Sequence, residues 1–327
     1  MRIINLGQIK SKQKVPKINT FVVDIENGLS LKNKAISSKY FYDDEGSKIF
    51  QKITKHPDYY LTRNEIEILN KVKIKLPNLL KLQEIDLIEL GPGDGSKSKI
   101  IIDGFLKCNY IVNYYPIDIS KKALELLNKT VKKSNRLKIN GIVSEYFEGL
   151  RFVKTISQNK QLILFLGSNI GNFERSQSVK FMKKIYNNIK KNSYVFTGFD
   201  LKKDLIKLNK AYNDSSNLTK QFNLNLLQRI NNELQGNFNL KKFIHYGNYN
   251  PLLGAMESFL ISTIKQEVYL KKINKTVVFE IYEPIHLEYS FKFSQEDIEK
   301  IALKTGFNVE CNYTNKDRGF INSLWKK

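Results

Sequence analysis

The segment that most constrains the fold of this chain is residues 85–97, where an apolar stretch leads directly into a turn rich in glycine. Apolar side chains occupy four of the first six positions, and this nearly continuous run predicts a strand covered on both faces. Gly91, Gly93 and Gly95 then remove the β-carbons that would hold a ligand away from the backbone. A helix is predicted next, from Ser98 to Leu106. Because open α/β sheets bind ligands where their strands end, we expect an α/β fold with a ligand at this turn.

The order of the glycines and the acidic residues around them indicate the class of ligand. A dinucleotide-binding turn follows the pattern G-x-G-x-x-G, whereas this turn reads G-P-G-D-G and is preceded by Glu89. An acidic side chain there disfavours a pyrophosphate and suits a ligand without phosphate groups. A second acidic residue, Asp118, ends the next predicted strand, Tyr110–Ile117, where a carboxylate can accept hydrogen bonds from ribose hydroxyls. Ser120 is predicted to cap the helix that follows.

The stretch E-L-G-P-G-x-G resembles motif I of the class I S-adenosylmethionine (SAM) methyltransferases. SAM carries a sulfonium, an ammonium group and a ribose, so acidic partners favour its binding. The resemblance implies SAM as the cofactor and an α/β fold with the Rossmann-like sheet of class I SAM methyltransferases.

Strands and helices alternate through the first two thirds of the chain, which predicts a parallel sheet with right-handed crossovers. After Asp118 the predicted elements are strands at 139–143, 162–166 and 194–199 and a helix at 176–190. The final predicted helix covers 295–304, between a capping box at Ser294 and Asp297 and a stop at Gly306. Strands at 309–313 and 320–324 are predicted to close the sheet as an antiparallel pair.

The pattern between these parts is different and predicts an insertion. Residues 203–250 are polar and predicted helical, and residues 255–293 are predicted extended. We therefore predict a methyltransferase core made of residues 62–202 and 292–327. Residues 1–61 and 203–291 are predicted to form a second, inserted substrate-recognition lobe.

Composition narrows the class of protein further. No apolar run in the 327 residues approaches the roughly 20 needed to span a membrane, and the N-terminus has no long apolar stretch typical of a signal peptide. The two cysteines, Cys108 and Cys311, do not make a disulfide scaffold, so we expect a protein of the reducing cytoplasm. We also expect it to be a monomer or a homodimer. No Cys/His cluster has the spacing of metal ligands, and no metal is expected.

The net charge of +22 has two explanations, an anionic partner such as nucleic acid or a composition rich in Lys, Asn and Ile. The lysines are spread along the whole chain, and arginine, the better phosphate ligand, is scarce. After the strand at 162–166 the chain reads Gly-Ser-Asn-Ile-Gly-Asn, without the Pro-Pro of methyltransferases that act on nucleic-acid bases. A nucleic-acid substrate is therefore disfavoured. A protein that binds SAM without catalysis is a third alternative.

Further segments resemble one particular family. They are Tyr40–Ser47, His56–Arg63, Phe165–Phe173, Gly198–Asp204, Ala211–Asp214, Phe222–Asn225, Met256–Glu257 and Glu288–Phe293. Together these segments resemble the histidine-specific SAM-dependent methyltransferases of ergothioneine biosynthesis, from about Lys39 to the end of the chain. The resemblance implies an N-methyltransferase that trimethylates the α-amino group of a free amino acid, L-histidine, to hercynine.

The resemblance implies that the amino acid binds between the core and the inserted lobe. Tyr42 and Asn172 are predicted catalytic residues, with Asn172 holding the amino and carboxylate groups. Glu288 and Ser290 are predicted to hydrogen-bond the imidazole, and Tyr212 to contact the carboxylate. The predicted substrate-binding residues are Tyr59, Gly167, Asn169, Tyr212, Ser258, Glu288 and Ser290. Without the resemblance, each of these tyrosines would be interpreted as a packing residue, which is the commoner role of tyrosine.

On the cofactor side, the resemblance assigns SAM to residues along the first strands of the core. The predicted cofactor-binding residues are Glu89, Gly91, Gly93, Lys97, Asp118, Glu145 and Tyr146. The family usually has Asp where Glu145 stands, Met where Ser258 stands and often Thr where Asn169 stands. A smaller, polar pocket wall changes the pocket volume, so another aromatic or basic amino acid is an alternative substrate.

Overall fold

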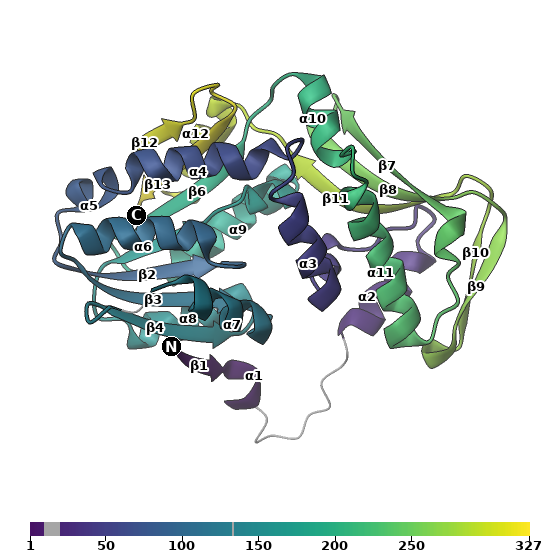
Figure 1. Ribbon diagram of the computed structural model, residues 1–327, viewed down its shortest axis with the longest axis horizontal. Helices are drawn as coiled ribbons and strands as arrows, with labels where there is room; N and C mark the ends of the chain where they lie inside the picture. Colours follow the sequence, from purple (N-terminus) through teal and green to yellow (C-terminus); the bar gives the residue numbers. More distant parts are fainter. Residues whose placement is uncertain (10–19, 133) are drawn as a thin grey trace. The chain divides into compact units, whose positions relative to one another are not determined.

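The structure is a computed structural model that describes residues 1–9, 20–132 and 134–327 (Figure 1). The described residues divide into two compact units. Unit 1 contains residues 1–9, 63–202 and 293–327, and unit 2 contains residues 20–62 and 203–292. No helix within the described ranges is long and apolar enough to cross a membrane.

Unit 1 is built on an eight-stranded sheet. Its strands in spatial order are β1 (Arg2–Asn5), β4 (Leu137–Val143), β3 (Ile111–Asp118), β2 (Glu84–Leu90), β5 (Gln161–Phe165), β6 (Tyr194–Asp200), β13 (Phe320–Lys326) and β12 (Asn308–Thr314). The strands from β1 to β6 pair in parallel, and β13 pairs antiparallel with both β6 and β12. Strand β2 is the first of the two central strands, with β3 on one side and β5 on the other. The order of the chain reverses there, and ligands of open α/β sheets bind at such a point.

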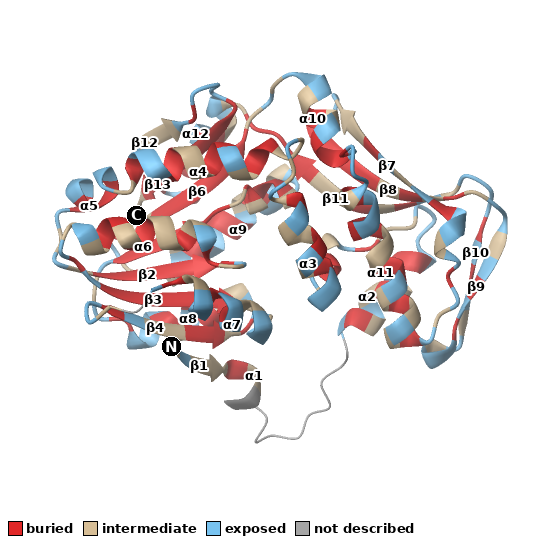
Figure 2. Ribbon diagram, in the orientation of Figure 1, coloured by how far each residue is buried: buried red, intermediate tan, exposed pale blue. Residues whose placement is uncertain are grey.

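The central strands of the sheet in unit 1 are buried because they are apolar on both faces, and Figure 2 shows β2, β3 and β6 in red. Its helices are α1 (Leu6–Ile9), α4 (Tyr60–Val72, which belongs to unit 1 from Arg63 onward), α5 (Lys75–Leu80), α6 (Ser96–Lys107), α7 (Lys121–Thr130), α8 (Tyr146–Ile156), η3 (Asn169–Asn172), α9 (Arg175–Asn188) and α12 (Gln295–Thr305). Helix α12 begins at the predicted capping box of Ser294 and Asp297 and ends at Gly306. The parallel sheet, the antiparallel closing pair and this helix confirm the predicted class I methyltransferase fold.

Unit 2 combines helices with antiparallel strands. Its helices are α2 (Thr20–Ser30), η2 (Ser38–Phe41), α3 (Asp44–Ile53), α10 (Leu205–Tyr212), α11 (Leu218–Leu234), η4 (Leu240–Lys242) and η5 (Lys271–Ile273). Strands β11 (Pro284–Phe291), β8 (Ala255–Ser262) and β7 (Phe243–Asn250) form one sheet, and β9 (Gln266–Leu270) pairs with β10 (Lys275–Phe279). The core of this unit includes the buried faces of α2, α3 and α11, with Ile25, Phe41 and Leu226 among its members.

Two segments differ from the sequence-based expectation. Residues 243–250 lie in the range predicted helical, but they form β7, which pairs with β8 over its full length. The N-terminal segment was assigned to the second lobe, whereas β1 pairs in parallel with β4 in unit 1. Strand β1 is explained by pairing with β4, which is distant in the sequence, and β7 by a hairpin with β8, which follows at Ala255. Neither a four-residue segment nor a polar eight-residue segment reveals such a pairing by itself.

Candidate active site

The glycine-rich turn of unit 1 begins where β2 ends. The N–H of Gly91 donates to the carbonyl of Ile117, 2.9 Å away, and so joins the turn to the end of β3. Gly91, Gly93 and Gly95 have φ angles of 68°, 59° and 77°, a left-handed conformation that other residues adopt at a cost. Gly95 is the N-cap of α6. The turn therefore follows the central strand at the reversal point of the sheet.

The glycines of this turn leave room for a ligand to different degrees. A β-carbon on Gly91 would lie 2.6 Å from the hydroxyl oxygen of Tyr146, so this position has no space for a side chain. A β-carbon on Gly93 would meet no atom of the described residues within 4 Å. The backbone at Gly93 is thus open to a ligand, which fits a cofactor held against the turn.

Gly91→Ala is expected to lower the free energy of unfolding more than Gly93→Ala. Both alanines carry the left-handed strain of about 1–2 kcal/mol, and only the one at Gly91 also displaces Tyr146, which adds about 1–3 kcal/mol. Urea denaturation measures the difference, with Gly93→Ala as the matched control. Equal losses in the two variants would contradict the crowding at Gly91.

Two acidic residues flank the turn, and burial affects both. Glu89 is 2% exposed, and its Oε2 accepts hydrogen bonds from the hydroxyls of Ser98 and Tyr114. Burial raises the pKa of Glu89 to about 7, against the pull of these two hydrogen bonds. Burial likewise raises the pKa of Asp118 to about 6, opposed by N–H donors from Ser120 and the neighbouring backbone. Asp118 therefore remains mostly ionised at pH 7, as a carboxylate that accepts from ribose hydroxyls must be.

The second pair of predicted cofactor residues lies at the start of α8. Glu145 is the exposed N-cap of that helix. Tyr146 is half-buried, and its ring packs edge-on against Phe165 and Phe181. Burial raises the pKa of Tyr146, so its hydroxyl keeps its proton. Gly91 and Tyr146, both among the predicted cofactor-binding residues, are neighbours across the turn.

A buried carboxylate, Glu65 on α4, ties together three parts of unit 1. Its side chain is 0% exposed and accepts from Lys97 Nζ at 2.6 Å and from the Gly167 N–H at 2.9 and 3.1 Å. The Nδ2 of Asn322 on β13 donates to the same carboxylate over 2.9 Å. A β-carbon on Gly198 would lie 2.4 Å from Glu65 Oε1, so the glycine provides the space for this carboxylate.

Glu65 was not among the predicted site residues, although the sequence holds a signal for it. Along α4 the buried positions include Leu61, Ile68, Leu69 and Val72, and Glu65 lies on the same stripe at helical spacing. A carboxylate in an apolar stripe needs a buried partner, which directs attention to Lys97.

The predicted substrate residues of unit 1 lie in one turn after β5. Gly167 has a φ of 82°, and Ser168, at φ 59°, accepts from the Asp200 N–H through its side chain at 2.9 Å. Asn169 and Asn172 begin and end the 3-10 helix η3, and both are half-buried. The hydrogen bond from Gly167 to Glu65 holds this turn next to Lys97.

In unit 2, two predicted residues share one face of the three-stranded sheet. Glu288 pairs with Ser258 across β11 and β8, and Ser290 pairs with Met256. Side chains two positions apart on a strand point to the same face, so Glu288 and Ser290 lie on the face that also holds Ser258. Burial raises the pKa of Glu288 to about 7, and the charge of Lys292 opposes that rise.

The face continues into a buried cluster of hydrogen bonds. Tyr212, at the end of α10, donates from its hydroxyl to Ser290 Oγ over 2.6 Å. Lys292, two residues after Ser290, donates to both hydroxyl oxygens, at 2.9 Å to Ser290 and 3.0 Å to Tyr212. Lys292 is 0% exposed and was not predicted from the sequence. Lys292 lies directly after β11 and two residues beyond Ser290, and continuing the alternation of that strand would have indicated it.

The other two predicted tyrosines belong to an aromatic cluster in the same unit. Tyr42 packs edge-on against Phe50 and Phe222, with ring centroids 5.4 and 5.6 Å apart, and is 37% exposed. Tyr59 packs against Phe50 at 6.2 Å and is half-buried. The structure thus brings Tyr42 and Tyr59 to one aromatic cluster, and Tyr59 also packs against the apolar cluster that contains Tyr212. Tyr212 and Ser290 share a hydrogen bond.

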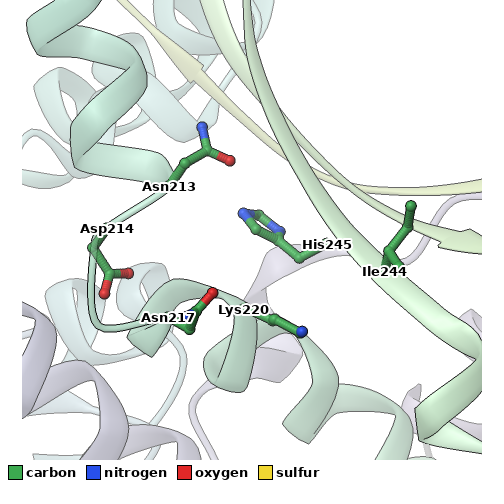
Figure 3. Close-up of a pocket in the computed structure, with 6 residues that line it drawn as sticks. All are labelled: Asn213, Asp214, Asn217, Lys220, Ile244 and His245. Carbon is green, nitrogen blue, oxygen red and sulfur yellow. The ribbon is translucent and has the colours of Figure 1, made fainter.

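A separate cavity of about 300 Å³ lies beside the segment that follows Tyr212 (Figure 3). It is lined by Asn213, Asp214, Asn217, Lys220, Ile244 and His245. The two ring nitrogens of His245 contact the Tyr212 carbonyl oxygen at 2.8 Å and Asn223 Nδ2 at 2.9 Å. Burial lowers the pKa of His245, which keeps the ring neutral. Because both of its nitrogens are occupied, His245 holds the end of α10 in place.

The described residues contain no group of three or more His, Cys, Asp and Glu side chains able to hold a metal ion.

Comparison with known proteins shows which family this chain resembles. Residues 21–327 match the family described as histidine-specific methyltransferase, SAM-dependent. The chain is 29% identical to the histidine N-alpha-methyltransferase of Mycobacterium tuberculosis over 305 residues, which cover 93% of this chain and 94% of that protein. It is 28% identical over 281 residues to ergothioneine biosynthesis protein 1 of Neurospora crassa, covering 84% of this chain and 31% of that protein.

A third relative is named for a different substrate. The 4-dimethylallyltryptophan N-methyltransferase of Claviceps purpurea is 24% identical over 315 residues, covering 89% of this chain and 90% of that protein. The family match covers most of the chain, and the sheet order is that expected of a class I methyltransferase. The predicted cofactor and enzyme class are thereby confirmed: this chain belongs to the histidine-specific, SAM-dependent methyltransferases.

Proposed function

We propose that this chain transfers methyl groups from SAM to the α-amino nitrogen of free L-histidine and trimethylates it to hercynine. The observation that carries the proposal is the polar set on β11 and α10, in which Ser290 and Tyr212 are buried and Glu288 is half-buried. There Glu288, Ser290 and Tyr212 offer an acceptor and hydroxyl groups suited to an amino acid with a polar ring. The similarity to enzymes named for histidine Nα-methylation and ergothioneine biosynthesis supports the same substrate.

The cofactor residues of unit 1 fit the chemical groups of SAM. The open backbone at Gly93 offers room for the ligand, and the carboxylate of Asp118 can accept from the ribose hydroxyls. Glu89, Gly91, Lys97, Glu145 and Tyr146 complete the proposed cofactor set. When bound, SAM supplies a methyl carbon made electrophilic by its sulfonium. The protein's task in such a displacement is to hold the nucleophile in line with that carbon.

The amino acid requires orientation and a neutral amine. Asn172 is proposed to hold the amino and carboxylate groups, with Tyr212 at the carboxylate and Gly167 and Asn169 lining the turn. α-Amino groups are largely protonated at pH 7, so the amine must lose a proton before it can attack. The faces of Tyr42 and Tyr59 suit the cation that each methylation leaves behind, because aromatic rings attract quaternary ammonium groups.

Incubation with SAM and each of the twenty amino acids, followed by mass spectrometry, tests this function. We expect histidine to gain up to three methyl groups on its α-nitrogen and to be used in preference to the others. Fragment masses that place the added methyl groups on the ring, or the use of another amino acid in place of histidine, would overturn the proposal. Salt-sensitive binding and methylation of RNA or DNA would revive the nucleic-acid alternative.

Ser258→Met is expected to sharpen the preference for histidine over tryptophan. Ser258 is 1% exposed and lies between Gly247 and Glu288 in the sheet, so a larger side chain there reduces the space next to Glu288. A methylene or two in a pocket changes discrimination by about 1–3 kcal/mol, so the ratio of kcat/KM values should rise about tenfold or more. Lys265→Met, which places the same side chain at an exposed position, is the matched control. An unchanged ratio in Ser258→Met would remove Ser258 from the pocket wall.

We also propose that the protein works in the cytoplasm as a monomer or homodimer. Its two cysteines are free, which suits a reducing compartment.

A further inference from the structure

The cluster of Tyr212, Ser290 and Lys292 has a defined direction of hydrogen bonding. An ammonium group has three donors and no acceptor, so both hydroxyl oxygens accept from Lys292. The Tyr212 hydroxyl donates its one hydrogen to Ser290. Ser290 Oγ therefore accepts two hydrogen bonds, one from each neighbour, which fills both of its lone pairs. The hydrogen of the Ser290 hydroxyl must then point out of the cluster, where it can only donate.

We propose that Lys292 is a positioning residue that fixes Ser290 as a donor and thereby makes the site select the neutral ring of its amino-acid substrate. This inference rests on the proposed function, in which Glu288 and Ser290 contact that ring. A neutral imidazole has one N–H and one unprotonated nitrogen, which match the acceptor Glu288 and the donor Ser290. An imidazolium has an N–H on both nitrogens, and one of them would face the Ser290 hydrogen.

The charges on this face of the sheet favour the same form of the ring. Glu288 and Lys292 lie four residues apart at alternating positions, and the charge of Lys292 favours the ionised form of Glu288 against the effect of burial. A neutral ring leaves this balance unchanged. A protonated ring would add a second positive charge next to the buried Lys292, and like charges repel strongly where water is excluded.

Nitrogen-15 NMR of ring-labelled L-histidine bound to the full chain tests the protonation state directly. At pH 6 the free ring is mostly protonated, because its pKa is about 6.5. With S-adenosylhomocysteine present to prevent turnover, we expect the bound ring to show one protonated and one unprotonated nitrogen. A bound ring protonated on both nitrogens would overturn the inference. This measurement needs no variant, so it remains decisive if a substitution of Lys292 prevents folding.

A kinetic comparison tests the role of Lys292 itself. The two pyrrolylalanines are histidine analogues in which one ring N–H is kept and the other ring nitrogen is replaced by CH. In the isomer whose CH faces Ser290, the Ser290 hydroxyl has no acceptor to donate to. We expect the wild-type protein to prefer histidine over that isomer by about 10- to 100-fold in kcat/KM. In Lys292→Met the Ser290 hydroxyl is free to turn and donate to Tyr212, and the preference should fall below about threefold. Ser290→Ala should lose the preference in the same way.

Tyr212→Phe is the matched control, because Lys292 still holds Ser290 Oγ and the donor remains. This variant should lower kcat/KM for both substrates and keep their ratio. A purely structural role for Lys292 would lower the two values equally, and a wild-type ratio in Lys292→Met would therefore overturn the assignment. If the wild-type protein methylates neither histidine nor the analogues, the proposed function fails, which is a different outcome from the failure of this inference.

Discussion

Glu65→Ala is expected to lower the free energy of unfolding by about 3–5 kcal/mol and to abolish most activity. Removing one partner of a buried ion pair leaves the other charge without compensation, and Lys97 would be left without its carboxylate at 2.6 Å. The N–H of Gly167 and the amide of Asn322 would lose their acceptor at the same time. Urea denaturation at pH 7 measures the stability, and methylation of histidine measures the activity.

The Lys99–Asp103 pair on α6 provides the matched control. Its charged atoms are also 2.6 Å apart, but its side chains are 35% and 38% exposed. Ion pairs this open to water contribute about 0–1 kcal/mol, so Asp103→Ala should have little effect. Glu65→Gln keeps an acceptor for the Gly167 N–H and removes the charge, and so separates the two contributions. Equal small losses in Glu65→Ala and Asp103→Ala would show that the buried carboxylate has no special role.

The elements that local patterns define were predicted correctly from the sequence. Strand β2 has an apolar run, and α12 has a capping box at one end and Gly306 at the other. Each of these signals lies within a few residues, so it requires no knowledge of the rest of the chain. Strand β7 differs because it is rich in Asn and Tyr, and its conformation depends on pairing with β8. Its side-chain pattern alone therefore predicted the wrong structure.

The residues of the candidate site also divide into those indicated by local sequence patterns and those defined by contacts between distant segments. Gly91 was predicted from the glycine-rich motif and Tyr146 from the family resemblance, and the two residues lie next to each other in the structure. Glu65 was missed because its partners lie 32, 102 and 257 residues further along the chain. Lys292 was missed because a lysine in a chain with 54 Lys and Arg residues carries no signal until its burial is known. The supporting residues of a site are less visible in a sequence than its contact residues, since they are defined by the fold.

Glu288→Ala is expected to lower kcat/KM for histidine by about 30- to several-thousand-fold and to leave the affinity for SAM nearly unchanged. Truncating one member of a buried, hydrogen-bonded polar pair costs about 2–5 kcal/mol of binding. The proposed cofactor residues all belong to unit 1, whereas Glu288 belongs to unit 2. Steady-state kinetics with histidine and calorimetric titration with SAM measure the two effects. Glu280→Ala, which removes an exposed carboxylate paired with Lys265, is the control.

The carboxylate of Glu288 should lower the free energy of unfolding at high pH. This effect distinguishes a residue that serves the substrate from one that stabilises the fold. Burial raises the pKa of Glu288 from 4.5 to about 7, so the folded protein holds this proton more tightly than the unfolded chain does. Between pH 4.5 and 7 the unfolded state binds fewer protons at this site, and the free energy of unfolding falls as the pH rises. Glu288→Gln removes that dependence. The free energy of unfolding of the variant minus that of the wild type should therefore be more favourable to the variant at pH 8 than at pH 5. A variant that is less active on histidine yet relatively more stable at high pH would identify Glu288 as a residue kept for its substrate, whereas a loss of both would assign it to the fold.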